Sequence, residues 1–308
     1  MKNIYELEQN GLLWVNVTKQ GEKELEEMQR RFGFDKADIA ESLPPYQRPK
    51  IVKRANYCFM VLHFPVFDRE TRRLGYTEID FFLGQNYLVT VHDNKLLSID
   101  NLFVECKKNL ASRGEYFSIS AAHILFEILT RLLDSIFPIL LHVNNDINLV
   151  DRKLFTKVSG REMAEEILRL KTNVVAFRRT MQGHKTVLER LMLYCGREYN
   201  LNVFQNYLNS LREFTNEIWH MVESQRESVD ALHETNESLL ALHTNDIMRT
   251  LTVISVITFP LTLLATIFAV HAPGNPFIDM FGGFWVIIAM MLVLALIMYT
   301  IFKKRDWV

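Results

Sequence analysis

The sequence predicts an α/β domain followed by a long stalk helix and two membrane-spanning helices. Three observations support this fold class: strand and helix patterns alternate near the N-terminus, one helical pattern continues without a glycine over residues 201–268, and two runs at about 251–270 and 281–302 carry no charge. About twenty apolar residues are enough for a helix to cross the hydrocarbon of a bilayer. We therefore expect a cytoplasmic α/β domain, a cytoplasmic helical region and a membrane part, at residues 1–115, 116–250 and 251–308.

The first domain is expected to contain short strands joined by turns. Runs of β-branched and aromatic residues between turn residues predict strands at 11–17, 57–64, 77–83 and 87–92. Gly84, Gln85 and Asn86 separate the last two runs and favour a hairpin turn. A helical pattern occupies 22–32, and Asp35 is a suitable N-cap for a short helix that ends before Pro44 and Pro45.

Helical periodicity dominates the rest of the chain. An amphipathic run at 118–155 contains Pro138, where a kink is expected, and a second long helix is expected at about 161–193. The longest pattern has no proline before Pro260. A helix of that length is improbable in a globular protein unless it forms a stalk or enters a membrane. The stalk, at about residues 200–250, is therefore expected to continue directly into the first span.

Composition argues against several function classes. The chain has 308 residues and a formal net charge of −1, so it offers no basic surface for nucleic acid. Three widely spaced cysteines form neither a metal motif nor a disulfide framework; they are Cys58, Cys106 and Cys195. No phosphate-binding loop of the GxxxxGK[ST] type occurs, so coupling to ATP hydrolysis is not expected. The histidines lack a clustered nucleophile or metal spacing, so no enzyme is expected; those considered are His63, His92 and His123.

Basic residues determine the predicted orientation in the membrane. Lys303, Lys304 and Arg305 directly follow the second apolar run, and basic residues beside a span mark the cytoplasmic side. Two spans then place both termini in the cytoplasm and leave a short link, residues 271–280, outside. The first residues contain no secretory signal. We expect a multi-pass protein of the inner (cell) membrane.

Hydroxyl groups follow one face of the first span. At 100° per residue they share about one third of the helix circumference; they are Thr252, Ser255, Thr258, Thr262 and Thr266. Such a face either packs against a neighbouring helix, with Pro260 as a kink, or faces water. Glu234, Asn245 and Met248 continue the same face into the stalk. Because one helix cannot enclose water, the second alternative requires several copies arranged around an axis.

Local sequence strings add a family resemblance. They are QRPK at 47–50, YLVTVH at 87–92, NDIMRTLTVISVITFPLT at 245–262 and the ending FKKRDWV. With the order of domain, long helix, span, short outer loop, span and basic tail, the whole chain resembles the CorA magnesium-transporter family. The resemblance implies a funnel-shaped homopentamer whose pore is lined by the first span of each subunit.

The resemblance also implies which residues line the pore. Carried over by position, the family's pore face falls on Asn245, Met248, Leu251, Ser255, Phe259 and Thr262, and the hydroxyl face adds Thr252 and Thr266. Met248 and Leu251 lie where the family has its apolar constriction, which gates by dewetting or by narrowing. Core packing between stalk helices is the alternative for both residues.

The outer end of the first span departs from the family. Where the family has Gly-Met-Asn, this chain has Ala269, Val270 and His271, and the outer link contains Asp279 as its one acid. Magnesium holds its waters tightly and prefers oxygen acceptors, whereas neutral imidazole suits zinc, nickel or cobalt. A protonated ring of histidines would repel cations and make permeation pH-dependent. Alternatively, His271 is an interfacial residue that ends the helix.

A second departure concerns regulation. The resemblance implies a regulatory Mg²⁺ site between subunits, formed by a carboxylate before QRPK and an acid on the long helix. Glu41 holds the first position, but Ser210, or Asn209 in a shifted alignment, holds the second, and Glu213 lies one turn away. We expect magnesium-dependent closing to be weakened or to depend on different residues.

These observations together predict a pentameric channel or transporter that moves divalent cations, magnesium first, down their electrochemical gradient. It needs no cofactor beyond the transported or regulatory cation, and Glu234 would concentrate cations at the cytoplasmic end. One alternative is a channel for zinc, nickel or cobalt, or a less selective one. The other is a pentameric sensor or scaffold that does not conduct.

Overall fold

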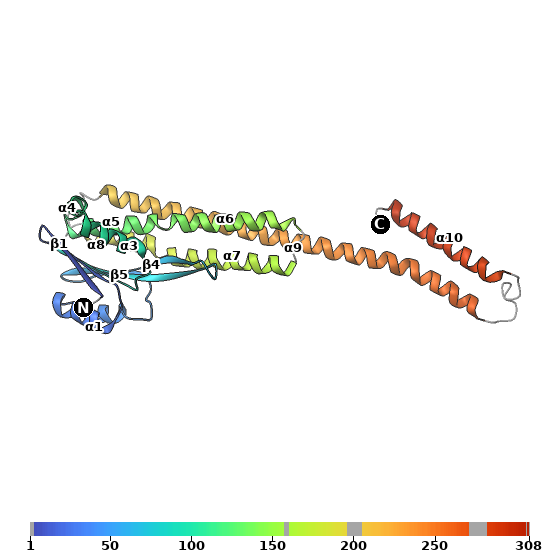
Figure 1. Cartoon of the computed structure of the whole chain (residues 1–308), viewed down its shortest axis with the longest axis horizontal. Coiled ribbons are helices and arrows are strands. Elements are labelled where there is room, and N and C mark those ends of the chain that lie inside the picture. The colour runs from blue at the N-terminus through green and yellow to red at the C-terminus, as the bar shows by residue number, and fades with distance from the viewer. Residues whose placement is uncertain (1–2, 157–159, 196–204, 271–281, 306, 308) are drawn as a thin grey trace. The chain divides into compact units, whose positions relative to one another are not determined.

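The computed structural model describes residues 3–156, 160–195, 205–270, 282–305 and 307 (Figure 1). They form two units, Met1–His233 and Glu234–Val308. The first unit contains the sheet and most helices. The second contains the end of one long helix and the last helix.

The first unit is built on a six-stranded sheet in the order β1-β2-β6-β5-β4-β3. Every neighbouring pair is antiparallel except β2 and β6, which are parallel. The strands are β1 Ile4–Gln9, β2 Leu12–Val17, β3 Lys50–Lys53, β4 Tyr57–Asp68, β5 Arg73–Gly84 and β6 Tyr87–His92. The four expected strands are present, and the β5–β6 hairpin turns at the expected residues. The sequence prediction missed β1 and β3.

Both missed strands lie at the edges of the sheet, where few side chains are buried. Only Leu7 of β1 and Ile51 of β3 are buried, so neither segment shows the alternation of a half-buried strand. Strand β1 joins β2 through Asn10 and Gly11, which both have positive φ, as a two-residue hairpin of the primed type requires.

Helices cover both faces of this sheet. Helices α1 (Glu22–Phe32) and α2 (Lys36–Glu41) lie on one face, over a core that includes Val17, Leu25 and Phe82 (Figure 1). The Asp35 side chain accepts a hydrogen bond from the Ala37 amide and caps α2, as predicted. The opposite face is covered by α5 (Ala121–Asp134), α7 (Gly160–Met181) and α8 (His184–Cys195); α3 (Leu97–Lys108), α4 (Leu110–Tyr116) and α6 (Phe137–Leu154) complete the unit.

Two expected long helices are each divided in two. The predicted kink at Pro138 is instead a break between α5 and α6, and Pro138 lies in the first turn of α6, where it needs no amide donor. The predicted helix at 161–193 breaks between α7 and α8 at Gly183. A Cβ atom at Gly183 would lie 2.5 Å from the Cβ of Pro49, so this close packing requires glycine.

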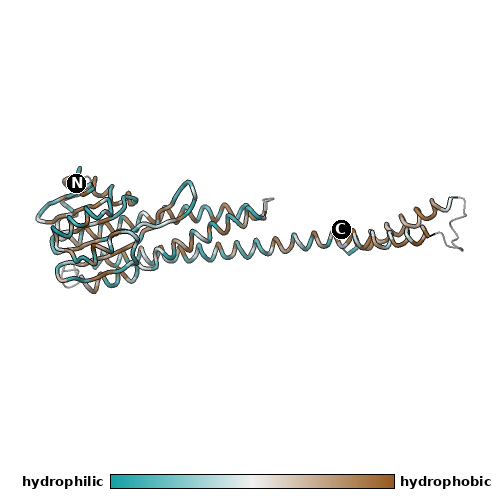
Figure 2. Tube along the Cα trace, turned by 90° about the horizontal axis from the view of Figure 1, so that it is seen from below, coloured by the Kyte–Doolittle hydropathy of each residue, from teal (hydrophilic) through white to brown (hydrophobic). Residues whose placement is uncertain are grey.

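The second unit contains the membrane candidates. Helix α9 (Gln205–Ala269) is continuous for 65 residues and includes Pro260, so no break separates the residues expected to form the stalk from the first candidate span. Helix α10 (Gly283–Lys304) is the second candidate span. Hydrophobic residues predominate in α10 and in the C-terminal part of α9 (Figure 2). The domain boundaries at 115 and 250 stay predictions.

Candidate pore helix and its surroundings

The face of α9 that packs within the second unit is apolar. Val253 is buried, and Ile257, Leu264 and Phe268 are half-buried. These positions recur at steps of four and seven, so they share one side of the helix. Helix α10 belongs to the same unit as this part of α9, and Arg249 of α9 contacts the ring of Trp307, which follows α10.

The predicted pore face lies on the other side of α9. Of the predicted pore-lining residues, only Ser255 is half-buried, and the others are exposed: Asn245, Met248, Leu251, Thr252, Phe259, Thr262 and Thr266. Phe259, a large apolar side chain, is 74% exposed. The structure thus places these residues together on a face that α10 does not cover. Whether that face lines a pore stays a prediction.

Each hydroxyl on this face donates a hydrogen bond to the backbone of its own helix. Thr252 donates to the carbonyl of Met248 at 2.7 Å, Ser255 to Leu251 at 2.8 Å and Thr262 to Thr258 at 2.9 Å. Thr258 and Thr266 do the same. A hydroxyl that donates its proton in this way keeps oxygen lone pairs as acceptors. The face therefore presents acceptor oxygens without needing a donor from another helix.

The ends of the face are only partly described. Ala269 and Val270 are exposed, whereas His271 and Asp279 lie outside the described residues. At the other end Glu234 is an exposed residue of α9. Their predicted roles at the pore mouth and in attracting cations stay predictions.

The proposed regulatory residues are separated within one chain. Glu41, at the end of α2, forms an ion pair with Lys50 of β3, while Ser210 and Glu213 are exposed on α9. No group of three or more His, Cys, Asp or Glu side chains suited to a metal occurs in the described residues. The expected site lies between subunits, so one chain does not test it. Lys50, the last residue of QRPK, is a partner of Glu41 that the sequence analysis did not consider.

Two buried carboxylates near Glu41 were also missed. Asp80 and Glu78 of β5 are 0% and 1% exposed. Glu78 accepts a hydrogen bond from the Gln47 amide and lies 3.4 Å from the His63 ring. Asp80 is fully buried, and the Ser42 hydroxyl is the one hydrogen-bonding group that lowers its pKa, against the effect of burial. Burial, together with the neighbouring charge of Glu78, raises the pKa of Asp80 well above its ordinary value. The signal in the sequence that could have revealed the buried Asp80 was an acidic residue inside an apolar run.

The histidines have structural surroundings. His92 lies 3.0 Å from the Asn16 side chain, and His184 lies 2.6 Å from the carbonyl of His63. Burial lowers the pKa of each ring to about 4. The His123 pKa is lowered for the same reason. These rings are therefore neutral at physiological pH.

Residues 9–304 match the family model described as CorA-like Mg²⁺ transporter protein. The chain belongs to the CorA-like Mg²⁺ transporter family. Members of this family are ion transporters and not enzymes, which agrees with the sequence-based expectation.

Two curated relatives cover nearly all of this CorA-family chain. The cobalt/magnesium transport protein CorA of Thermotoga maritima is 26% identical over 298 residues, which are 96% of this chain and 83% of the relative. The putative metal ion transporter YfjQ of Bacillus subtilis is 25% identical over 311 residues, which are 100% of this chain and 94% of the relative. These relatives support divalent cation transport as the general activity.

Solved structures show the same fold. The complete CorA magnesium transporter from Methanocaldococcus jannaschii matches with a TM-score of 0.82 at 21% identity, over 99% of this chain and 94% of that one. The full-length CmaX protein matches with a TM-score of 0.74 at 15% identity, over 96% and 89%. The fold predicted from the sequence, an α/β domain with a long helix and terminal apolar helices, is therefore confirmed.

Proposed function

We propose that this protein conducts divalent cations, Mg²⁺ first among them, through a pore lined by the α9 helices of five copies. The observation that carries the proposal is the exposed hydroxyl face of α9, on the side that α10 does not cover. In one chain this face would meet hydrocarbon, which is unfavourable for polar groups. Packing several copies around an axis places the face against water instead.

The chemistry of the face suits a hydrated cation. Mg²⁺ gives up its waters reluctantly, so a pore can bind it through oxygen atoms that accept hydrogen bonds from those waters. The hydroxyls of Ser255 and Thr262 donate to their own helix and retain lone pairs for this purpose. Met248 and Leu251 would form an apolar ring that closes by dewetting.

The orientation follows from the basic end of α10. Lys303 and Lys304 lie in its last turn, and the positive-inside rule assigns that end to the cytoplasm. Both termini would then be cytoplasmic, in the cell membrane.

Regulation by Mg²⁺ is proposed to be weak in this protein. Glu41 would contribute to a site between subunits, but it pairs with Lys50 in the chain, and Ser210 lacks a carboxylate. Ser210→Asp should strengthen closing by Mg²⁺, measured as a lower Mg²⁺ concentration for half-maximal inhibition of flux. No change in that concentration would contradict the assignment.

A second candidate is selectivity for transition metals. It is favoured by one observation, the sequence Ala269-Val270-His271 at the place of the family's Gly-Met-Asn. A ring of neutral imidazoles suits Zn²⁺, Ni²⁺ or Co²⁺. This candidate requires that flux of these metals falls at mildly acidic pH and in His271→Ala.

Ion uptake into proteoliposomes tests the proposal. Mg²⁺, Co²⁺, Ni²⁺, Zn²⁺ and K⁺ are compared at neutral and mildly acidic pH. We expect Mg²⁺ uptake, reduced about tenfold or more in Ser255→Leu and Thr262→Leu because a bulky apolar ring dewets the pore.

Thr300→Leu is the matched control, since Thr300 is an exposed threonine of α10 that also bonds its own helix. Equal flux in all three variants would contradict the pore assignment. No flux of any ion from an intact pentamer would favour a sensor or scaffold without conduction.

A further inference from the structure

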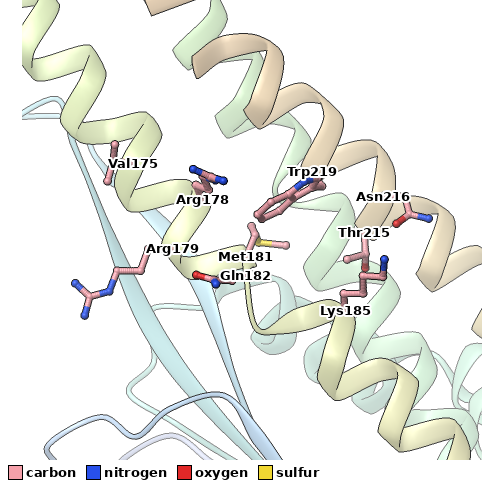
Figure 3. A pocket seen from close by; sticks show the side chains of 9 residues that line it. All are labelled: Val175, Arg178, Arg179, Met181, Gln182, Lys185, Thr215, Asn216 and Trp219. Carbon is pink, nitrogen blue, oxygen red and sulfur yellow. The ribbon is translucent and has the colours of Figure 1, made fainter. Parts of the chain in front are cut away.

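The first unit has a cavity of about 640 Å³ beside Trp219, between α7, the start of α8 and the first part of α9. Its cations point to different sides of Trp219, so they do not gather around one ligand (Figure 3); they are Arg178, Arg179 and Lys185. Elsewhere in the same unit, two acids of β5 are buried, and their surroundings leave a proton to be accounted for.

These two carboxyl groups lie on one face of the sheet. Glu78 and Asp80 are alternate residues of β5, so their side chains point to the same face from Cα atoms about 7 Å apart. Phe82, the next residue on that face, belongs to the core covered by α1 and α2. Glu78 is 1% exposed and Asp80 is fully buried. Neither carboxyl group can therefore be stabilised by bulk water.

The sheet register shows which strand residues flank Asp80. Asp80 lies opposite Val61 of β4, and Val61 lies opposite Lys50 of β3, so the three residues form one row across the sheet. Residues directly opposite each other point to the same face. The Lys50 ammonium lies 5.6 Å from the centre of the Phe59 ring, which is also on this face. On its other side Asp80 lies opposite the apolar Val91 of β6. Lys50 is therefore the cation that this row provides.

The hydrogen bonds of Glu78 leave one of its oxygens without a donor. The Gln47 amide donates to Oε2, and the His63 ring of β4 lies 3.4 Å from the same atom. Oε1 is buried and accepts no hydrogen bond from the residues that the structure describes. A buried acceptor is costly unless a donor reaches it. A protonated Asp80 carries an O–H group and supplies such a donor.

The groups around Asp80 do not neutralise a carboxylate there. Lys50 already forms an ion pair with Glu41, the last residue of α2. The Ser42 hydroxyl, which hydrogen-bonds to Asp80, also donates to the Asp38 carbonyl at 3.2 Å, and a hydroxyl has one proton for both acceptors. The charges that act on Asp80 are thus two carboxylates and one ammonium group with a partner of its own. In agreement, burial and the neighbouring carboxylates raise the pKa of Asp80 well above its ordinary value.

We propose that Asp80 and Glu78 share one proton, and that this proton keeps Lys50 on Glu41 and so holds the end of α2 against β3. While Asp80 keeps the proton, it donates to Glu78 and does not compete for the ammonium group. When the proton leaves at alkaline pH, Asp80 becomes a charged group in a region of low dielectric, where opposite charges attract strongly. Lys50 then turns from Glu41 to Asp80, and the end of α2 is released.

The buried acids, Lys50 and Glu41 thus form a pH-sensitive latch. All four residues belong to the first unit, so the latch does not depend on the proposed pore.

Infrared spectroscopy of the full-length protein in detergent tests the shared proton, because a protonated carboxyl group has a C=O band separate from the bands of carboxylates. Spectra are recorded at pH 7 and over an alkaline series. We expect the parent chain to show this band at pH 7 and to lose it at alkaline pH, and Asp80→Asn to lack it. Asp151→Asn, at an exposed position of α6, is the matched control and should retain the band.

Neighbouring charges should shift the pH at which the band disappears. Glu78→Gln removes a negative charge, so the band should disappear at a pH lower by about one unit. Lys50→Met removes a positive charge, so the band should persist to a pH higher by about one unit. A general loss of folding would move the band in the same direction in both variants.

Hydrogen exchange measured by mass spectrometry tests the release of α2. Protection of residues 36–53, which contain α2 and β3, is compared on both sides of the pH at which the band disappears, after correction for the pH dependence of free amides. We expect protection in the parent chain to fall by about threefold, as for the opening of a partly exposed ion pair. Asp80→Asn should keep its protection, because its amide replaces the protonated acid as a neutral donor.

Either of two results would overturn the proposal. A parent spectrum without the band at pH 7, or a band that is unchanged in Asp80→Asn, would show that the two acids hold no proton. An equal fall of protection in the parent chain and in Asp80→Asn would show that the proton does not control the contact between Lys50 and Glu41.

Discussion

The guanidinium of Arg249 lies 5.7 Å from the centre of the Trp307 ring. Arg249 belongs to α9 just before the first apolar run, and Trp307 follows α10, where its amide donates to the Phe302 carbonyl at 3.0 Å. The contact therefore joins the start of the first candidate span, in α9, to the residues that follow the second candidate span, α10. It closes the hairpin of α9 and α10 at the end opposite to their connecting link.

This contact should be measurable as a coupling. In a double-mutant cycle with Arg249→Leu and Trp307→Leu, we expect a coupling of about 0.5–1 kcal/mol, as for a partly exposed cation–π pair. Thermal unfolding of the protein in detergent provides the free energies. A second cycle, with Lys303→Gln and Trp307→Leu, serves as the control. If the coupling between Arg249 and Trp307 is no larger than the coupling in this control cycle, the contact is not formed.

Asp80 should oppose folding at neutral pH. The pKa of Asp80 is raised in the native state above its ordinary value of 3.8. When the pH rises above 3.8, Asp80 therefore loses its proton in the unfolded chain but keeps it in the native state. Native stability therefore falls as the pH rises through that region. Asp80→Asn should increase the free energy of unfolding at pH 7 by on the order of 1 kcal/mol or more, and by much less near pH 4.

Asp151→Asn, at an exposed position of α6, is the control for this comparison and should have little effect. Chemical denaturation at both pH values provides the measurement. A loss of stability in Asp80→Asn at pH 7 would mean that the carboxylate has a stabilising partner in the assembled protein.

His92 and His184 should make the first unit sensitive to acid. The native pKa of each is about 4, and its ordinary value is 6.5. Between these values the unfolded chain binds protons that the native state excludes, so stability falls as the pH falls from 6.5 toward 4. Each ring can contribute a loss on the order of a few kcal/mol over this range.

The slope of stability against pH should therefore be smaller in His184→Gln than in the parent chain. His243→Gln replaces an exposed histidine of α9 and should leave the slope unchanged. Urea unfolding followed by circular dichroism over pH 5 to 7 measures both slopes. Identical slopes in the parent chain and in His184→Gln would contradict the neutral, buried state of His184.

Gly183 should tolerate no side chain. A Cβ atom there would lie 2.5 Å from Pro49, so Gly183→Ala must shift the α7–α8 break or the QRPK segment. We expect a loss of about 1–3 kcal/mol, typical of overpacking. Gly75→Ala is the control, because its Cβ would meet only the Val66 carbonyl oxygen at 3.9 Å. Similar thermal unfolding temperatures for the two variants would exclude the clash.

The sequence by itself determined the parts of this protein that depend on local pattern. The two apolar runs and the long glycine-free helix follow from composition and periodicity, which act within one helix and need no partner. The strands in the middle of the sheet were predictable because burial on their faces leaves a strong hydrophobic pattern. The edge strands β1 and β3 were not, since their pairing depends on neighbours and few of their side chains are buried.

Tertiary structure alone decided the features that depend on contacts between distant residues. The close approach of Pro49 explains why position 183 requires glycine, and Lys50 is the partner that pairs with Glu41. Contacts between distant residues also decided which side of α9 packs within the second unit, and they formed the cavity beside Trp219. Periodicity shows which residues share a face, but only packing shows which face is covered, because burial depends on chain segments that the local pattern does not contain.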